Sequence, residues 1–191
     1  MNKTVFIIHR WGADHSSDWY PWLKNKLEEK GFTTVVPDMP NTDEPGIKEW
    51  VEFLTQTVGA GKQTAYRKTF FIGHSVGCQT ILRYLESLKA GVLVGGVVFV
   101  GGWLKLGGLT EEEATVVKPW IETPIDFKKV KAHCPKFTAI FSNNDKWVPI
   151  ENVELFKKKL GSQVVLLPKR GHFMNEDGAR ELPEVLSYIL L

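Results

Sequence analysis

Residues 73–77 read Gly-His-Ser-Val-Gly, which matches the pattern G-x-S-x-G. An apolar run precedes the motif and an amphipathic helical pattern follows it, which is the strand, turn and helix context that the motif requires. Glycines on both sides permit a sharp turn that exposes the serine Oγ, because a Cβ at either position would collide with a neighbouring strand or helix. The motif therefore predicts Ser75 as a nucleophile. The alternative is an ordinary glycine turn with an incidental serine.

A serine hydroxyl becomes a good nucleophile near neutral pH only when a histidine accepts its proton and a carboxylate orients that histidine. Two histidines follow Ser75 in the chain, namely His133 and His172. His172 lies in the loop just after the last apolar run, whereas His133 precedes a run and would face the other edge of a parallel sheet. We therefore predict His172 as the general base and interpret His133 as a solvated or capping residue.

The carboxylate is expected between the serine and the histidine in chain order. Asp145 ends the polar run Ser142-Asn-Asn-Asp145 directly after an apolar run, at the strand end where parallel sheets build their sites. The rivals Asp126 and Glu111–Glu113 do not directly follow such a run. We predict Asp145 as the acid, with a plain turn aspartate as the alternative.

Acyl transfer also needs two backbone N–H donors for the oxyanion of the intermediate. One should come from Val76, which follows the nucleophile, and the other from Trp11, in the loop after the first apolar run. Trp103 and Trp147 should fall near the same strand ends, and we assign them to substrate binding together with His74. His74 adjoins the nucleophile in sequence and must point away from it, so we interpret it as a wall or supporting residue and not as the base.

Short apolar runs alternate with amphipathic helical patterns, which predicts a parallel sheet covered on both faces in a three-layer α/β/α fold. The predicted strands are Thr4–Ile8, Thr33–Val36, Thr69–Ile72, Leu93–Val100, Phe137–Phe141 and Gln163–Leu167. The predicted helices are Trp19–Lys30, Ile47–Val58, the segment after Gly77, Glu151–Leu160 and Pro183–Leu190.

The chain of 191 residues is expected to form one domain, 1–191. Ser17 or Asp18 should cap the first helix. The segment 103–127 mixes apolar and charged residues, and two interpretations stay open, a short cap over the site and an ordinary surface crossover.

The balance of 24 basic and 22 acidic residues leaves a net charge of +2 without a basic run, so nucleic acid is not an expected partner. The first residues are too short an apolar stretch for a signal peptide or a membrane span, which predicts a cytoplasmic protein with no membrane partner. Cys78 and Cys134 show no metal-binding spacing and are interpreted as reduced thiols. Neither G-x-G-x-x-G nor G-x-x-x-x-G-K-[ST] occurs, so a nucleotide is not expected either. We predict no metal and no cofactor.

The order of several segments resembles the small serine hydrolases typified by YdeN and retinoblastoma-binding protein nine, within the α/β-hydrolase superfamily. The segments are VFIIHRW, DWYPWLKNKL, VVPDMPN, FIGHSVGCQTILRYLE, VGGVVFVGGW, PIDF, NNDKWVP and RGHFMNEDG. The resemblance implies strand order 2-1-3-4-5-6, a triad of Ser75, Asp145 and His172, and carboxylesterase-like activity. One departure is Arg10, because many relatives carry His-Gly where this chain has His-Arg, and the shape of the oxyanion loop depends on that position.

These observations predict an enzyme that hydrolyses small carboxylic esters or thioesters through an acyl-serine intermediate. The alternative is a hydrolase-shaped protein-binding module with little turnover, which would recognise a protein through exposed tryptophans. One member of the family is named for binding a retinoblastoma-type pocket protein through a Leu-x-Cys-x-Glu segment. That segment is absent from this chain. A protein partner is therefore not indicated, and a small-molecule substrate is expected.

Overall fold

Six parallel strands form one sheet in the order β2-β1-β3-β4-β5-β6. The structure is a computed structural model that describes residues 3–59 and 63–190. Its strands are β1 Thr4–Ile8, β2 Thr33–Val35, β3 Thr69–His74, β4 Gly96–Val100, β5 Phe137–Ser142 and β6 Gln163–Leu167. The predicted strand order and the parallel sheet are confirmed.

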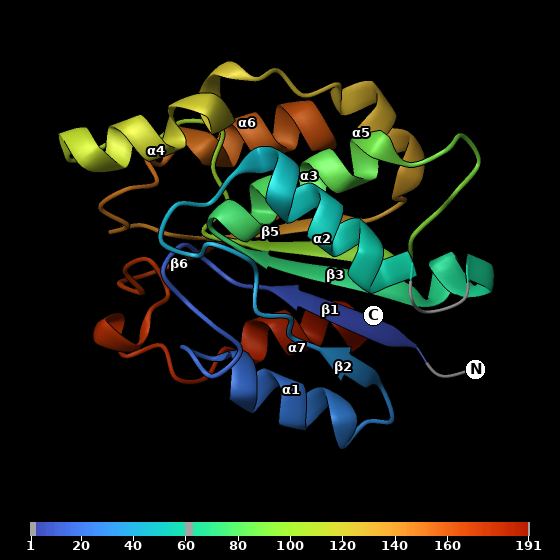
Figure 1. Cartoon of the computed structure of the whole chain (residues 1–191). Coiled ribbons are helices and arrows are strands. Elements are labelled where there is room, and N and C mark those ends of the chain that lie inside the picture. Colours follow the sequence, from blue (N-terminus) through green and yellow to red (C-terminus); the bar gives the residue numbers. More distant parts are fainter. Residues whose placement is uncertain (1–2, 60–62, 191) are drawn as a thin grey trace.

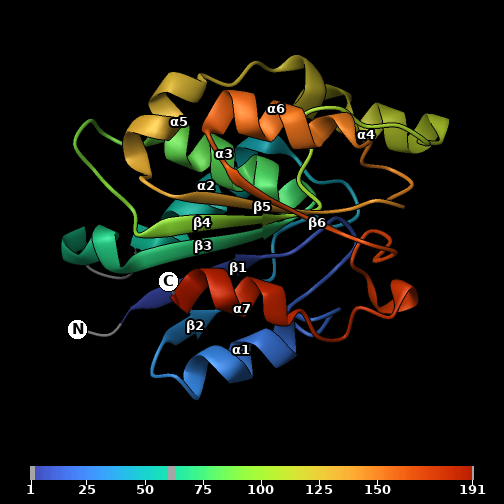
Figure 2. The same ribbon diagram turned by 180° about the vertical axis from the view of Figure 1, so that it is seen from behind.

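Helices cover both faces of the sheet, as Figures 1 and 2 show from opposite sides. Helices α1 and α7 lie against one face, and α2 to α6 lie on the other. The helices are α1 Tyr20–Glu28, α2 Ile47–Gly59, α3 Val76–Ser87, α4 Glu111–Glu122, α5 Phe127–His133, α6 Glu151–Leu160 and α7 Pro183–Leu190, with short 3-10 helices at Gln63–Lys68 and Asn175–Asp177. The three-layer architecture predicted from the alternating runs is therefore confirmed.

The apolar core is divided between the two faces of the sheet. On β1, Val5 and Ile7 pack in the layer with α1 and α7, whereas Phe6 and Ile8 pack in the layer with α2 and α3. Successive side chains of a strand point to opposite faces, and here both faces are buried. This double coverage explains why the strands read as continuous apolar runs in the sequence.

The start of α1 differs from the prediction. The N-cap position belongs to Trp19, which makes no side-chain capping hydrogen bond, and a proline occupies the first turn. The prediction that Ser17 or Asp18 caps this helix is wrong. Asp18 adopts a positive φ of 51°, and its carboxylate binds the Arg10 guanidinium. The Asp18 carboxylate therefore forms an ion pair with Arg10 and does not cap the helix. The sequence spacing did not reveal this ion pair.

None of the helices in the described part of the chain has the length and apolar character that crossing a membrane needs.

Candidate active site

Ser75 occupies a strained turn between the end of β3 and the start of α3. Its backbone has φ 54° and ψ −117°, a region that non-glycine residues rarely adopt. Two hydrogen bonds hold it there, because Ser75 N donates to Val100 O at 3.0 Å and Cys78 N donates to Ser75 O at 2.9 Å. The surrounding elements therefore stabilise a conformation that a serine alone would avoid.

The two glycines of the motif are required by close backbone packing. A Cβ at Gly73 would lie 2.8 Å from the backbone of Cys78, and a Cβ at Gly77 would lie 2.2 Å from the carbonyl oxygen of Ile8. Both separations are far below van der Waals contact. The collisions involve helix α3 in the first case and strand β1 in the second, which explains why the motif requires glycine at both positions.

The structure brings Asp145 and His172 into direct contact. His172 Nδ1 donates to Asp145 Oδ2 at 2.7 Å, and the two side chains are only 6% and 1% exposed. The other oxygen, Asp145 Oδ1, accepts hydrogen bonds from the backbone N–H groups of Trp147 at 3.0 Å and Val148 at 3.1 Å. The carboxylate is thus fixed by its own turn and holds the ring with Nδ1 protonated, which leaves Nε2 able to accept a proton.

Ser75 and His172 line the same cavity. In the part of the chain that the structure describes, Ser75 Oγ makes no hydrogen bond to the His172 ring, and such contacts are often longer in the absence of substrate. Gly101, which has a positive φ of 53°, passes close to the ring, since a Cβ there would lie 3.3 Å from His172 Cε1. The bare backbone of Gly101 therefore leaves room for the ring beside the carboxylate.

The rival residues have other partners. His133 Nδ1 donates to the carbonyl oxygen of Val92 at 2.7 Å. Asp126 caps α5 by accepting from two backbone N–H groups of that helix, and Glu113 forms a capping box with Thr110 at the start of α4. His133 is buried, so the interpretation of it as a solvated or capping residue is wrong, because its ring instead ties α5 to the segment before β4. Asp126 serves as the N-cap of α5.

A cavity of about 260 Å³ opens at the carboxyl ends of the strands. Trp11 and Val76, the predicted oxyanion residues, lie in its wall, as do Trp103 and Trp147. Its lining is Arg10, Trp11, Gly12, Pro45, Ser75, Val76, Trp103, Leu106, Leu109, Glu113, Val117, Trp147, His172 and Met174. The lining is mostly apolar, and it includes the side chains of Arg10, Glu113 and His172.

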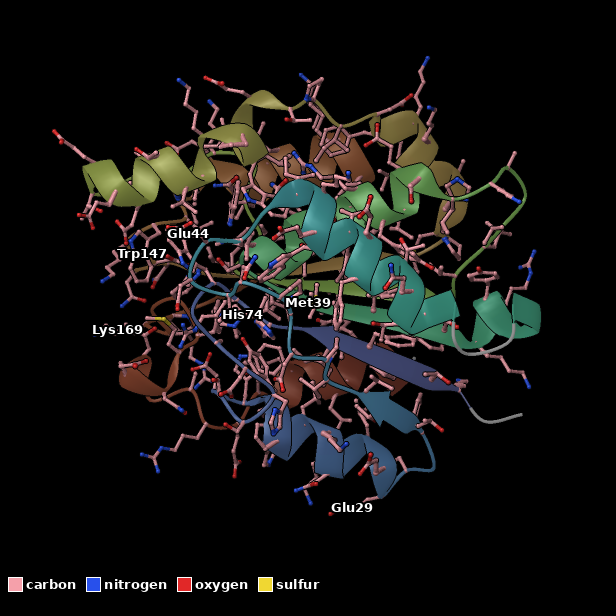
Figure 3. The ribbon with its side chains drawn as sticks, viewed as in Figure 1. Glu29, Met39, Glu44, His74, Trp147 and Lys169 are labelled. Carbon is pink, nitrogen blue, oxygen red and sulfur yellow. The ribbon has the colours of Figure 1, made fainter. Side chains whose placement is uncertain are left out.

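His74 does not line this cavity, so the structure does not place it where a substrate-binding residue would be. It is fully buried behind His172, with ring centroids 5.3 Å apart. Figure 3 shows His74 at the same end of the sheet as Trp147, on the side nearer α1. Because Ile72 packs toward α1 and α7, strand alternation sends His74 toward the same layer, where it meets Trp19 and Tyr20.

Part of the segment 103–127 forms a wall of the cavity, through Leu106 and Val117 among others. Its first residues are tied to α6 by the fully buried Asn152, whose Oδ1 accepts from Leu104 N at 2.7 Å and whose Nδ2 donates to Lys105 O at 2.9 Å. Trp120 Nε1 donates to the carbonyl oxygen of Pro45 at 2.7 Å. The segment is therefore held to the body of the protein near its beginning and near its end.

Sequence reasoning missed the hydrogen-bond partners of the polar residues that follow β1. His9 Nδ1 donates to Arg10 O at 2.7 Å, and His9 Nε2 accepts from Met39 N at 2.9 Å. Burial lowers the pKa of His9, and the occupied Nε2 lone pair agrees with a neutral ring. Arg10 Nε donates to Asp18 Oδ2 at 2.8 Å. The sequence does place these polar residues directly after a fully buried strand. Buried polar groups need hydrogen-bond partners, so this position indicates that partners exist elsewhere in the chain.

Within the described residues, no three His, Cys, Asp or Glu side chains are grouped so that they could hold a metal ion.

Comparison with known proteins places these features in a wider context. A family model described as "Serine hydrolase" matches residues 5–190. The hydrolase YdeN of Bacillus subtilis (strain 168) is 28% identical over 185 residues, covering 97% of this chain and 93% of YdeN. The serine hydrolase RBBP9 of Rattus norvegicus is 25% identical over 177 residues, covering 92% of this chain and 89% of RBBP9.

Solved structures share the fold over the whole chain. The crystal structure of the ydeN gene product from B. subtilis has a TM-score of 0.89 and 26% identity, covering 99% of this chain and 97% of that one. Est1E from Butyrivibrio proteoclasticus, solved with ferulic acid bound, has a TM-score of 0.71 and 14% identity, covering 98% and 90% of the two chains. At that level of identity the second likeness concerns the fold alone.

Proposed function

The chain belongs to the serine hydrolase family, and we propose that it cleaves small carboxylic esters or thioesters with Ser75 as nucleophile, His172 as general base and Asp145 as the acid. The observation that carries the proposal is the 2.7 Å hydrogen bond between Asp145 and His172 in the wall of a cavity that Ser75 also lines. A serine on a strained turn, a histidine and a buried carboxylate are the parts that acyl transfer to a serine requires.

The reaction proceeds in two halves. His172 Nε2 takes the proton of the Ser75 hydroxyl as Oγ forms a bond to the carbonyl carbon, and the leaving alkoxide or thiolate departs with that proton. Water then repeats the sequence on the acyl-serine, which releases the carboxylic acid and restores the hydroxyl. Asp145 stabilises the imidazolium that forms in each half and keeps the proton on Nδ1 throughout.

Two backbone amides are proposed to stabilise the oxyanion. Val76 is the first residue of α3, so its N–H has no acceptor within the helix and lies at the positive end of the helix dipole. Trp11 follows β1 and lies in the cavity wall beside Ser75. Donors fixed in this way need no rearrangement as negative charge develops on the carbonyl oxygen.

The size and the lining of the cavity favour a substrate with a small and mainly apolar acyl group. Its volume is about 260 Å³, and the segment that contributes Leu106 and Val117 is fastened by Asn152 and Trp120. We propose that this segment acts as a short, fixed cap. A long acyl chain would have to displace it, whereas a short ester or thioester fits beneath it.

Burst kinetics with p-nitrophenyl acetate test the proposal. We expect a rapid release of about one nitrophenolate per enzyme molecule, followed by slower steady turnover, and the loss of both phases in Ser75→Ala. Equal turnover by wild type and Ser75→Ala, with the variant folded by circular dichroism, would reject Ser75 as the nucleophile.

The alternative of a binding module depends on exposed tryptophans. All 7 tryptophans of the chain are buried or half-buried, so the surface that this alternative needs is not present among them. The enzyme is therefore the function that the geometry favours. A cytoplasmic location, a small-molecule substrate and the lack of a nucleic-acid, membrane or cofactor requirement stay predictions.

A further inference from the structure

A continuous chain of hydrogen bonds, buried or partly buried, connects the loop after β1 to the loop that carries His172. Arg10 N donates to Tyr20 Oη at 3.2 Å, and Tyr20 Oη lies 2.7 Å from His74 Nδ1. His74 Nε2 lies 2.7 Å from the carbonyl oxygen of His172. Tyr20 and His74 are both fully buried, and neither lines the cavity. The three bonds therefore join the oxyanion loop to the histidine loop from behind the site.

The chemistry of the partners fixes the direction of each bond. A carbonyl oxygen only accepts, so His74 Nε2 must carry a proton that it donates to His172 O. Burial lowers the pKa of His74 well below its ordinary value, so the ring is neutral and Nδ1 has only a lone pair. Tyr20 must then donate its hydroxyl proton to Nδ1, and burial raises the pKa of that phenol well above its ordinary value. The remaining lone pair of Tyr20 Oη accepts from Arg10 N.

An ion pair supports the same two loops. The Asp18 side chain is buried, and its carboxylate accepts from Arg10 Nε at 2.8 Å and from the backbone N–H of Asn175 at 2.9 Å. Arg10 belongs to the oxyanion loop and Asn175 to the loop after His172. The loops are thus joined twice, once through Asp18 and once through Tyr20 and His74.

We propose that Tyr20 and His74 are positioning residues that set the separation between the oxyanion loop and the His172 loop. The inference rests on the proposed function. Neither residue touches the substrate. With a neutral His74 each link has one donor and one acceptor, and the chain connects the loop of Trp11 to the backbone of His172. Asp18 Oδ2 lies 3.9 Å from His74 Nδ1, so the two connections between the loops adjoin one another. Small displacements of catalytic groups slow the chemical step, so a fixed separation between the two loops should increase kcat.

Tyr20→Phe is the sharpest test because it deletes one oxygen and keeps the ring. It leaves His74 Nδ1 and Arg10 N without their partner, and the loops lose one of their two connections. We expect kcat for p-nitrophenyl acetate, per active site counted from the burst, to fall by about tenfold. KM should stay within about twofold of wild type, because no cavity wall has changed.

Tyr84→Phe is the matched control. Tyr84 is a buried tyrosine on α3 whose ring packs against Phe71 on the far side of the sheet from His74. Its kcat should equal that of wild type. A second pair tests the other link, since His74→Gln keeps an N–H that can reach the His172 carbonyl and His74→Leu does not. We expect His74→Gln to retain at least fivefold more kcat than His74→Leu.

A purely structural role for the chain would change melting temperature without changing kcat per active site. Wild-type kcat in folded Tyr20→Phe would therefore overturn the inference, as would equal kcat in His74→Gln and His74→Leu if Tyr20→Phe does not fold. Wild type and Ser75→Ala are measured in the same assay. Turnover that does not depend on Ser75 overturns the proposed function as well, whereas Ser75-dependent turnover with an unaffected Tyr20→Phe overturns the positioning role alone.

Discussion

His172 Nδ1 donates to Asp145 Oδ2 across a separation of 27 residues, and the second oxygen of the same carboxylate is bound by its own turn. A carboxylate held on both oxygens can rotate only by losing hydrogen bonds. The ring therefore keeps one tautomer, and the orientation of the proposed base depends on Asp145 more than on any other single side chain.

Asp145→Asn is expected to keep the fold and lose the activity. The amide can still accept from the turn, but its NH₂ group would face His172 Nδ1 and favour the wrong tautomer. We expect kcat for a nitrophenyl ester to fall by about 10⁴-fold, the size of effect seen when such an aspartate is replaced by asparagine.

Asp126→Asn is the control for that substitution, because Asp126 caps α5 and asparagine is an equally good cap. Its kcat should match wild type. If Asp145→Asn and Asp126→Asn were equally active, the acid would lie elsewhere.

Lowering the pH should destabilise the protein through two of its buried histidines, His74 and His9. Burial lowers the pKa of His74 and of His9 in the folded state, while in the unfolded chain both titrate near the ordinary value of 6.5. Below that pH the unfolded chain binds more protons than the folded one, so the free energy of unfolding falls as pH falls. The stability they contribute is complete above about pH 6.5 and is lost as the pH drops toward the folded-state pKa values.

Between roughly pH 6 and pH 5 the slope from His74 should approach about 1.4 kcal/mol per pH unit, and His9 should add to it in the same direction. Urea unfolding of wild type at several pH values measures it. His74→Gln removes the group with the more strongly lowered pKa, so its slope in this window should be shallower than that of wild type. A free energy of unfolding that does not change between pH 7 and pH 5 would mean that these rings take up protons in the folded state.

Gly77→Ala should disrupt the nucleophile turn. Its Cβ would lie 2.2 Å from Ile8 O, so β1 or α3 must move, and we expect a loss of about 3 kcal/mol of stability together with most of the activity. Gly59→Ala is the control, since a Cβ there meets nothing within 4 Å and α2 is helical at that position. Thermal unfolding compares the two variants, and equal melting temperatures would contradict the close packing described for the turn.

The acyl preference should change when the wall of the cavity is cut back at Val117. Val117 is 4% exposed and lines the cavity, whereas Ile121, one turn further along α4, is 47% exposed. Val117→Ala should raise kcat/KM for nitrophenyl hexanoate relative to acetate by about tenfold, roughly the value of one or two methylene groups in an apolar pocket. Ile121→Ala should leave that ratio unchanged. The same ratio in both variants would place the acyl group in another part of the molecule.

The sequence predicts the parallel sheet and the turn at Ser75 because both depend on local patterns. It predicts the strand order through the resemblance to a known family. Strands buried on both faces leave continuous apolar runs, and G-x-S-x-G marks a turn that only glycine permits. Observed strand ends lie within three residues of the predicted ones, the largest difference being β4, which begins at Gly96 and not at Leu93.

The hydrogen bonds that Tyr20 and His74 make behind the site could not be predicted in the same way. Tyr20 and His74 are 54 residues apart, and His74 and His172 are 98 residues apart. No periodicity links residues from different loops, so only the folded chain shows that they touch. The position of His74 next to Ser75 in sequence predicts a role in substrate binding, yet strand alternation turns the side chain toward α1 and away from the cavity.

Covalent labelling tests the central claim most directly, since it asks whether the Ser75 hydroxyl is activated. Wild type, Ser75→Ala and Ser87→Ala are each treated with a fluorophosphonate and analysed by peptide mass spectrometry, Ser87 being a serine of α3 whose hydroxyl donates to Tyr84 O. We predict rapid, stoichiometric labelling of the Ser75 peptide in wild type and Ser87→Ala, and none in Ser75→Ala. Labelling of another residue, or no labelling of Ser75 in folded wild type, would contradict the proposed mechanism.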